Sequence, residues 1–182
     1  KAYIIELFLI PMKKLNIGCG KNYKKNWVNL DYNKKYGPDV VHNLDNFPYP
    51  FRDGQFDYIY CSHILEHVED LFKTLKEMER ILKPKGILHI RVPHFSNGNG
   101  YNDLSHRRFF GWFTVDQVLD GYYNQKFDFK IIEKRFNFLA EGHRNANVLF
   151  SWFFNLVPKQ FYERFLCWIM PVGEIELKLQ KI

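Results

Sequence analysis

The sequence predicts an α/β fold built on a mostly parallel sheet. Short apolar runs alternate with helical patterns through the first hundred residues. The run Gly86–Val92 is apolar at nearly every position, which is typical of a strand buried on both faces of a sheet. A length of 182 residues suits a single domain with a sizeable core.

The first four strands are expected where short apolar runs stand between turn residues. These runs cover residues 14–17, 27–30, 40–44 and 56–60. A helix follows them, because Leu71, Leu75, Met78 and Leu82 recur at spacings of three and four. Asp70 is placed to cap its start, and the turn at 83–86 ends it before the fifth strand, 86–92.

After Pro93 the sequence becomes polar, and 94–108 is expected to form a long loop. A short helix is expected at 114–119, with Thr114 as its N-cap. Residues 127–138 and 175–182 are predicted to be strands six and seven. Between them, 145–172 is an aromatic helical insertion.

Charge and cysteine content narrow the classes of function. The formal net charge is +6, which fits a solvated basic surface or a site for a polyanion such as RNA, a phosphorylated glycan or an anionic membrane. Cys19, Cys61 and Cys167 are far apart and have no metal-binding spacing, so the sequence predicts no metal site. Reduced cysteines favour a cytoplasmic protein.

Residues 1–11 are expected to lie outside the folded domain, which then covers 12–182. The segment is apolar but interrupted by Glu6, and it is too short to span a membrane. It has no small-residue cleavage site, so it does not have the pattern of a signal peptide.

The most informative motif is Leu15–Gly20 followed by Asp31. An apolar run breaks into a Gly-x-Gly turn, and Gly18 and Gly20 allow the backbone to approach a ligand closely. Asp31 can accept hydrogen bonds from both hydroxyls of a ribose. A dinucleotide is not favoured, because there is no third glycine at Tyr23 and Asp31 comes too early.

Several motifs in order resemble class I S-adenosylmethionine-dependent methyltransferases, in particular the methyltransferase type 11 subgroup. They are Leu15–Gly20, Asp31, Phe56-Asp57, Ser62–Val68 and Leu82–Gly86. The resemblance implies a Rossmann-like sheet of seven strands, mostly parallel, with helices on both faces and an antiparallel last strand. It also implies S-adenosylmethionine as cofactor and S-adenosylhomocysteine as product.

The resemblance also implies roles for individual residues at the carboxyl ends of the strands. The turn would pass under the methionine and ribose, Asp31 would hold the ribose hydroxyls, and the residues after strands three and four would meet the adenine and the methionine end. The cofactor-binding residues are then Gly18, Cys19, Gly20, Asp31, Asn43, Leu44, Cys61, Ser62 and His63.

Three departures from the family pattern concern the methionine end. Asn16 stands where an acidic residue is usual, and Asn22 stands where a third glycine is usual. The stretch between Gly20 and Trp27 has room for barely two helical turns. The methionine end would then be held differently from the family pattern.

Methyl transfer from a sulfonium is an in-line displacement, so the protein must align the acceptor and exclude water. Histidine suits the task of removing a proton near neutral pH. The candidate bases are His94, on the loop after strand five, and then His106 and His63. Asp103 is a further acidic candidate on the same loop.

Arg107 and Arg108 are candidates to bind a phosphate or carboxylate of the acceptor. The alternative is that they tie the loop to Asp103 or Asp116 through ion pairs.

The sequence therefore favours methylation of a small molecule, a sugar or a lipid-linked glycan. The alternatives are an RNA methyltransferase, which the basic charge favours, and a non-catalytic module that binds S-adenosylmethionine. The aromatic insertion would cover the substrate, form a homodimer face, or rest on a membrane through 149–170 as a peripheral contact.

Overall fold

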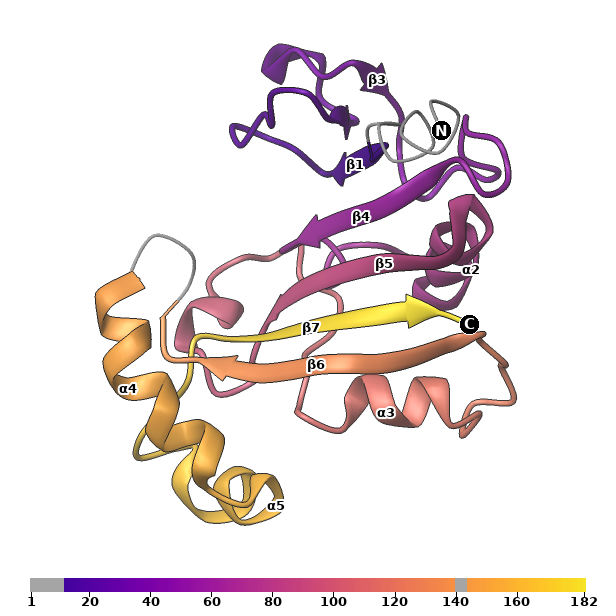
Figure 1. Cartoon of the computed structure of the whole chain (residues 1–182). Helices are drawn as coiled ribbons and strands as arrows, with labels where there is room; N and C mark the ends of the chain where they lie inside the picture. Colours follow the sequence, from indigo (N-terminus) through magenta and orange to yellow (C-terminus); the bar gives the residue numbers. More distant parts are fainter. Residues whose placement is uncertain (1–11, 140–143) are drawn as a thin grey trace, which may run out of the picture.

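A computed structural model describes residues 12–139 and 144–182 of the chain; the predicted extension at 1–11 lies outside them. The described residues form one sheet with the strand order β3-β2-β1-β4-β5-β7-β6 (Figure 1). The strands are β1 Lys14–Ile17, β2 Val28–Asp31, β3 Val40–Val41, β4 Phe56–Ser62, β5 Leu82–Pro93, β6 Phe129–Asn137 and β7 Glu174–Lys181.

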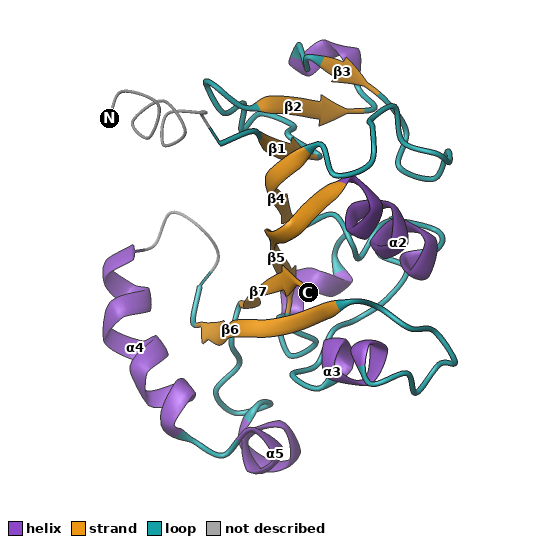
Figure 2. Cartoon of the chain, turned by 45° about the vertical axis from the view of Figure 1, so that its right-hand side comes forward, coloured by secondary structure: helices purple, strands orange, loops and turns teal. Residues whose placement is uncertain are grey.

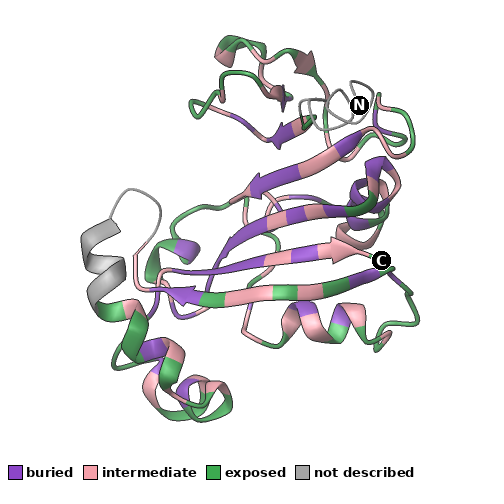
Figure 3. Ribbon diagram, in the orientation of Figure 1, coloured by how far each residue is buried: buried purple, intermediate pink, exposed green. Residues whose placement is uncertain are grey.

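The sheet confirms the predicted architecture. Neighbouring strands from β3 to β5 are parallel, while β7 is antiparallel to both β5 and β6. The last strand in sequence is therefore inserted between two earlier ones. The strands β1, β4 and β5 carry much of the buried core, as the burial colours in Figure 3 show.

Helices lie on both sides of the sheet. The helices α2 and α3 lie on one side and α4 on the other (Figure 2). The helices are α2 Leu71–Ile81, α3 Thr114–Leu119, α4 Arg144–Leu156 and α5 Lys159–Phe161, with short 3₁₀ turns at η1 Lys34–Tyr36 and η2 Gly98–Tyr101 and a π-turn at η3 Tyr162–Leu166.

The helix α2 begins as the sequence predicts. The Asp70 side chain accepts a hydrogen bond from the backbone N–H of Lys73, and so caps the first turn. Its apolar face, which includes Leu75 and Met78, is buried against the sheet. The helix ends at Ile81, and β5 follows directly at Leu82.

Three local predictions were wrong. The fifth strand begins earlier than the expected 86–92, because Leu82 and the residues 83–86 belong to β5 and not to the helix or to a turn. Thr114 is the first residue of α3 and not its cap; its Oγ1 accepts a hydrogen bond from the Gly111 N–H, so it stabilises the preceding turn instead. The third strand covers 40–41 and not 40–44, because Asn43 starts a turn in which its carbonyl accepts a hydrogen bond from the Asn46 N–H.

The shortened segment between β1 and β2 contains turns and no helix. Trp27 packs there in edge-on contacts with Tyr58 and Tyr60, at centroid distances of 5.6 and 6.5 Å. Lys14 and Lys24 lie over the Trp27 ring, at 5.4 and 5.7 Å. These side chains cover the part of the sheet beside this segment.

Candidate active site

The glycine turn after β1 is fixed against the end of β2. The backbone N–H groups of Gly18 and Cys19 both donate to the carbonyl of Leu30, at 2.8 and 3.0 Å. Gly18 has a φ of 65°, in the left-handed region that favours glycine. A Cβ at Gly18 would lie 2.0 Å from Cδ1 of Ile64, so no larger residue fits without displacing that side chain.

Asp31 is oriented by two backbone donors. Its Oδ2 accepts from the Gly20 N–H and its Oδ1 from the Asn33 N–H, both at 2.8 Å. The residue is 6% exposed. A carboxylate oxygen has two acceptor positions, so each oxygen keeps one for a further donor. This is the arrangement that two adjacent ribose hydroxyls require.

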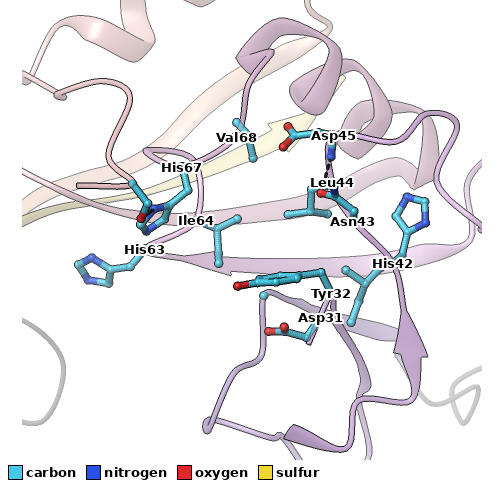
Figure 4. A pocket seen from close by; sticks show the side chains of 13 residues that line it. Asp31, Tyr32, His42, Asn43, Leu44, Asp45, His63, Ile64, His67 and Val68 are labelled. Carbon is cyan, nitrogen blue, oxygen red and sulfur yellow. Dashed lines mark hydrogen bonds between the residues drawn. The ribbon is translucent and has the colours of Figure 1, made fainter. Parts of the chain in front are cut away.

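A cavity of about 320 Å³ opens over the turn and Asp31 (Figure 4). Its wall is formed by side chains that follow β1, β2, β3 and β4, so it lies at the carboxyl edge of the parallel strands. The lining residues are Gly18, Leu30, Asp31, Tyr32, His42, Asn43, Leu44, Asp45, His63, Ile64, His67, Val68 and Ser105.

The predicted cofactor residues divide into three groups. Five of them line the cavity: Gly18, Asp31, Asn43, Leu44 and His63. Gly20 acts on Asp31 through its N–H. Cys19 and Cys61 are buried, and with Ser62 they lie outside the cavity lining.

Sequence analysis missed several lining residues, above all Tyr32, Ile64, His67 and Ser105. A signal existed for the first three, because each stands within or beside a motif already assigned to the site. His67 does not cap the following helix, because Asp70 makes the cap. Ser105 had no local signal, because it arrives from a loop 38 residues after His67.

Asn16, which replaces the usual acidic residue, is 3% exposed and does not line the cavity. Its Nδ2 donates to the Asn29 Oδ1 and to the Asn22 carbonyl, both at 3.0 Å. These two hydrogen bonds from Asn16 therefore stabilise the turn between β1 and β2. It offers no charge to the cavity.

His63 is held in a left-handed conformation, with a φ of 54°. Its Nε2 lies 3.0 Å from Oε2 of Glu174, and its Nδ1 lies 3.5 Å from Oε1 of Glu66. Burial alone would lower the pKa of His63, but these two carboxylates outweigh it and raise the pKa to about 9. The ring keeps its proton at neutral pH, which favours a hydrogen-bond donor there over a base.

His94 is 1% exposed and does not line the cavity. Its Nδ1 lies 2.8 Å from Oγ of Ser96, and its Nε2 lies 3.2 Å from Oε1 of Glu163. The ring also contacts Phe95 and Phe136. Both nitrogens are thus engaged in the core, and the role of His94 as a base stays a prediction.

His106 lies outside the lining but packs on a lining residue. Its ring centroid is 4.7 Å from that of His67. Its Nδ1 lies 2.7 Å from the Gly100 carbonyl, and its side chain is 11% exposed. The role of His106 in catalysis also stays a prediction.

The two arginines have different partners from those considered in the sequence. Arg108 donates from Nη1 to the carbonyls of Leu65 and Val68 and from Nη2 to that of Glu69, at 2.6–3.0 Å. Arg107 is half exposed and pairs with the Glu69 carboxylate at 2.9 Å. Both thus hold the turn after β4, and their role in binding an acceptor stays a prediction.

The residues present fit an adenosine-bearing sulfonium. Asp31 has free acceptor positions for a ribose, the bare backbone at Gly18 allows close approach, and the apolar side chains of Leu44 and Ile64 flank the space between. When bound, S-adenosylmethionine supplies an activated methyl group.

The described residues form a Rossmann-like sheet with a cavity at the carboxyl edge of its parallel strands, and comparisons with known proteins say what the chain is similar to. Residues 15–90 match the family described as "Methyltransferase domain". Over these residues the chain is similar to class I S-adenosylmethionine-dependent methyltransferases of the type 11 family. This family and fold imply S-adenosylmethionine as the cofactor.

Curated relatives match over part of the chain. A demethylmenaquinone methyltransferase of Staphylococcus saprophyticus is 33% identical over 83 residues, which are 46% of this chain and 32% of that protein. The ubiquinone/menaquinone biosynthesis C-methyltransferase UbiE of Rickettsia akari is 35% identical over 79 residues, 42% of this chain and 30% of that protein. The chain thus spans about a third of the length of these relatives.

Solved structures share the fold over nearly the whole chain. A SAM-dependent methyltransferase from Archaeoglobus fulgidus aligns with a TM-score of 0.63 and 18% identity. The alignment covers 99% of this chain and 90% of that chain. An S-adenosylmethionine-dependent methyltransferase from Mesorhizobium loti has a TM-score of 0.58 and 14% identity, with coverages of 93% and 91%.

Proposed function

We propose that this chain transfers a methyl group from S-adenosylmethionine to a small-molecule, sugar or lipid-linked glycan acceptor. The observation that carries the proposal is the orientation of Asp31. Its carboxylate is fixed by the N–H groups of Gly20 and Asn33 and faces a cavity of about 320 Å³. Groups held in place before a ligand arrives bind it at a lower cost in conformational entropy.

The choice of an acceptor with an apolar part rests on the surface of the aromatic insertion. Large apolar side chains from α4 to the residues after η3 are exposed, at 41–77%. They are Phe150, Trp152, Phe153, Leu156, Phe161, Phe165, Trp168, Ile169 and Met170. So many exposed apolar residues within one segment favour contact with a lipid, a membrane surface or a second protein.

A second hollow supports the same choice. It has a volume of about 380 Å³ and lies between the loop after β5 and the segment before β7. Phe138, Ile169 and Met170 form much of its apolar wall. In the described part of the chain, no helix is long and apolar enough to cross a bilayer. Peripheral membrane contact through 149–170, a homodimer and a cytoplasmic location stay predictions.

Some relatives are named as methyltransferases of menaquinone or ubiquinone biosynthesis. A quinone, as a small apolar molecule, is therefore a further candidate acceptor for this chain. RNA is the second candidate, and the net charge of +6 favours it. Binding to RNA that falls steeply with added salt would support this candidate, and no retention on RNA at low salt would reject it.

The first experiment is calorimetric titration of the chain with S-adenosylmethionine and S-adenosylhomocysteine, with NAD as control. Micromolar binding of both sulfur ligands and none of NAD is expected. A methyl donor labelled on the methyl group then distinguishes glycan, quinone and RNA acceptors. Absence of binding to either sulfur ligand would overturn the proposal, and cofactor binding without transfer to any of these acceptors would favour a non-catalytic module.

A further inference from the structure

A second cluster of chemically active side chains lies behind one wall of the cavity. Glu66 and His67 stand in the turn after β4, and His106 stands in the loop after η2. Each residue offers one possible ligand atom, and these three atoms lie within 4.8 Å of one another. Two histidines and one carboxylate form a recurrent ligand set for divalent transition metals.

Glu66 is a buried carboxylate without a hydrogen-bond partner among the described residues. It is 0% exposed, and neither Oε1 nor Oε2 accepts a hydrogen bond. The Nδ1 of His63 lies 3.5 Å from Oε1. Burying a carboxylate is costly unless its lone pairs are satisfied. The protonated ring of His63 balances part of this charge, but Oε1 and Oε2 accept no hydrogen bond, and a metal cation would take one of them as a ligand.

Hydrogen bonds determine which nitrogen each histidine presents. The hydroxyl of Ser105 donates to Oδ1 of Asp103 at 2.6 Å, so Oγ of Ser105 must accept from Nδ1 of His67, at 2.9 Å. The Nδ1 of His106 likewise donates to the Gly100 carbonyl at 2.7 Å. In the neutral rings, Nε2 of both histidines therefore carries the lone pair. The Nε2 of His106 lies 4.0 Å from Oδ2 of Asp103, which is beyond hydrogen-bond distance.

This pattern is the one found around histidine ligands of metals. A ligating histidine commonly donates its other N–H to a carbonyl or to a carboxylate-linked group, which fixes the tautomer and orients the ring. Here the Gly100 carbonyl serves one ring and the Ser105–Asp103 pair serves the other. The outer hydrogen bonds are thus present alongside the three candidate ligands.

The cluster opens toward the cavity. His67 and Ser105 are lining residues, and His67 lies beside Ile64 and His63 in Figure 4. Glu66 is fully buried and His106 is mostly buried behind them. A cation held by three protein ligands would keep at least one open position, and an oxygen ligand could reach it from the cavity side.

We propose that Glu66, His67 and His106 hold one divalent transition-metal cation, of the zinc, manganese or cobalt kind. Imidazole ligands disfavour magnesium and calcium, which prefer all-oxygen sets. Metal–nitrogen bonds of about 2.0–2.1 Å require the three ligand atoms to draw closer than their present separation. This site departs from the sequence analysis, which looked for metal ligands only among the cysteines.

The test is a titration of chelator-treated protein with Co²⁺ and Zn²⁺. One equivalent of Co²⁺ should produce visible ligand-field absorption, and Zn²⁺ should displace it. Glu66→Gln and His67→Gln should each weaken binding by at least about tenfold, because each removes a ligand. The matched control is His42→Gln, a histidine that lines the same cavity outside the cluster, and it should bind as the wild type does.

The Glu66→Gln variant keeps the side-chain size, and Glu174 stays paired with His63 when the Glu66 charge is removed; thermal unfolding verifies that the metal-free variant is folded. No binding to the wild type, or equal binding by wild type and Glu66→Gln, would overturn the site. The site does not depend on the proposed methyl transfer. Titration of the same samples with S-adenosylhomocysteine separates the metal site from the proposed function. If the wild type does not bind S-adenosylhomocysteine, the result counts against the proposed function alone.

Discussion

The backbone N–H of Gly20 donates a hydrogen bond of 2.8 Å to Oδ2 of Asp31, so the glycine turn after β1 orients the acidic residue that ends β2. Because the two residues are only 11 apart in sequence, a single short segment builds the side of the cavity where we propose that the ribose binds. Its backbone and its carboxylate are therefore positioned together.

Replacing Asp31 should remove cofactor binding. We expect Asp31→Ala to weaken binding of S-adenosylhomocysteine by about 10- to 100-fold, since a hydrogen bond to a charged group contributes about 1.5–3 kcal/mol. Calorimetric titration measures the effect. Asp120→Ala, at an exposed position at the end of α3, is the control and should bind normally. Unchanged binding by Asp31→Ala would remove Asp31 from the site.

Replacing Gly18 should close the cavity and strain the backbone. In Gly18→Ala, the new methyl group would meet Ile64, and the positive φ would cost about 1–2 kcal/mol. We expect lower stability in urea unfolding and weaker cofactor binding. Adding Ile64→Ala should restore part of the binding but leave the backbone cost. Full stability in the single variant would contradict the clash.

The loop that carries Arg107 and Arg108 gives a matched pair of variants. Arg108→Ala leaves three carbonyls of the turn after β4 without their donor, and should lower the free energy of unfolding by about 1–3 kcal/mol. Arg107→Ala removes one exposed ion pair and should cost less than about 1 kcal/mol. If urea unfolding showed an equal loss in the free energy of unfolding for both variants, the two arginines would not differ in their contribution to stability.

Stability should fall in acid through two carboxylates on β7. Burial alone would raise the pKa of Glu174 and of Glu176, but hydrogen bonds from His63 and Arg91 to the first, and from His89 and Arg135 to the second, lower both. A folded pKa below the unfolded value means that the stabilisation is present above the unfolded pKa of about 4.3 and is lost as pH falls through the folded pKa.

Urea unfolding between pH 7 and pH 3 measures this loss. Glu176→Gln should be less stable at pH 7 and should show a smaller further loss in acid, because it no longer gains a proton on unfolding. Parallel pH curves for the variant and the wild type would indicate that Glu176 does not contribute.

The three cysteines should resist alkylation in the folded protein. Cys19, Cys61 and Cys167 are buried, and burial raises the pKa of each thiol; nearby Asp31 raises that of Cys19 further. Mass spectrometry after iodoacetamide treatment at pH 8 should find all three unmodified until denaturant is added. Fast labelling of Cys19 alone would show that the glycine turn opens readily.

Local patterns predicted the features that depend on neighbours in sequence. The spacing of Leu71, Leu75 and Met78 and the cap at Asp70 predicted α2. The turn and Asp31 were predicted to lie at one site, and Gly18 and Asp31 do line one cavity. Thr114 was misassigned because a hydroxyl serves a turn or a helix start equally well.

Features that depend on distant contacts could not be predicted. The partner of His63 is Glu174, 111 residues further on, and Ser105 reaches His67 across 38 residues. No periodicity encodes such pairs. The burial of Glu66 likewise follows from the packing of several segments, so a carboxylate that accepts no hydrogen bond became visible only in the structure.

The position of β7 between β5 and β6 affects the order in which the strands can join the sheet during synthesis. The ribosome releases Phe129–Asn137 before Glu174–Lys181, yet β6 joins the sheet only by pairing with β7. During synthesis β6 therefore has no strand to pair with until β7 has emerged, after α4 and α5. The same delay applies to Glu174, which pairs with the cavity residue His63, so this part of the cavity wall acquires its final charge last.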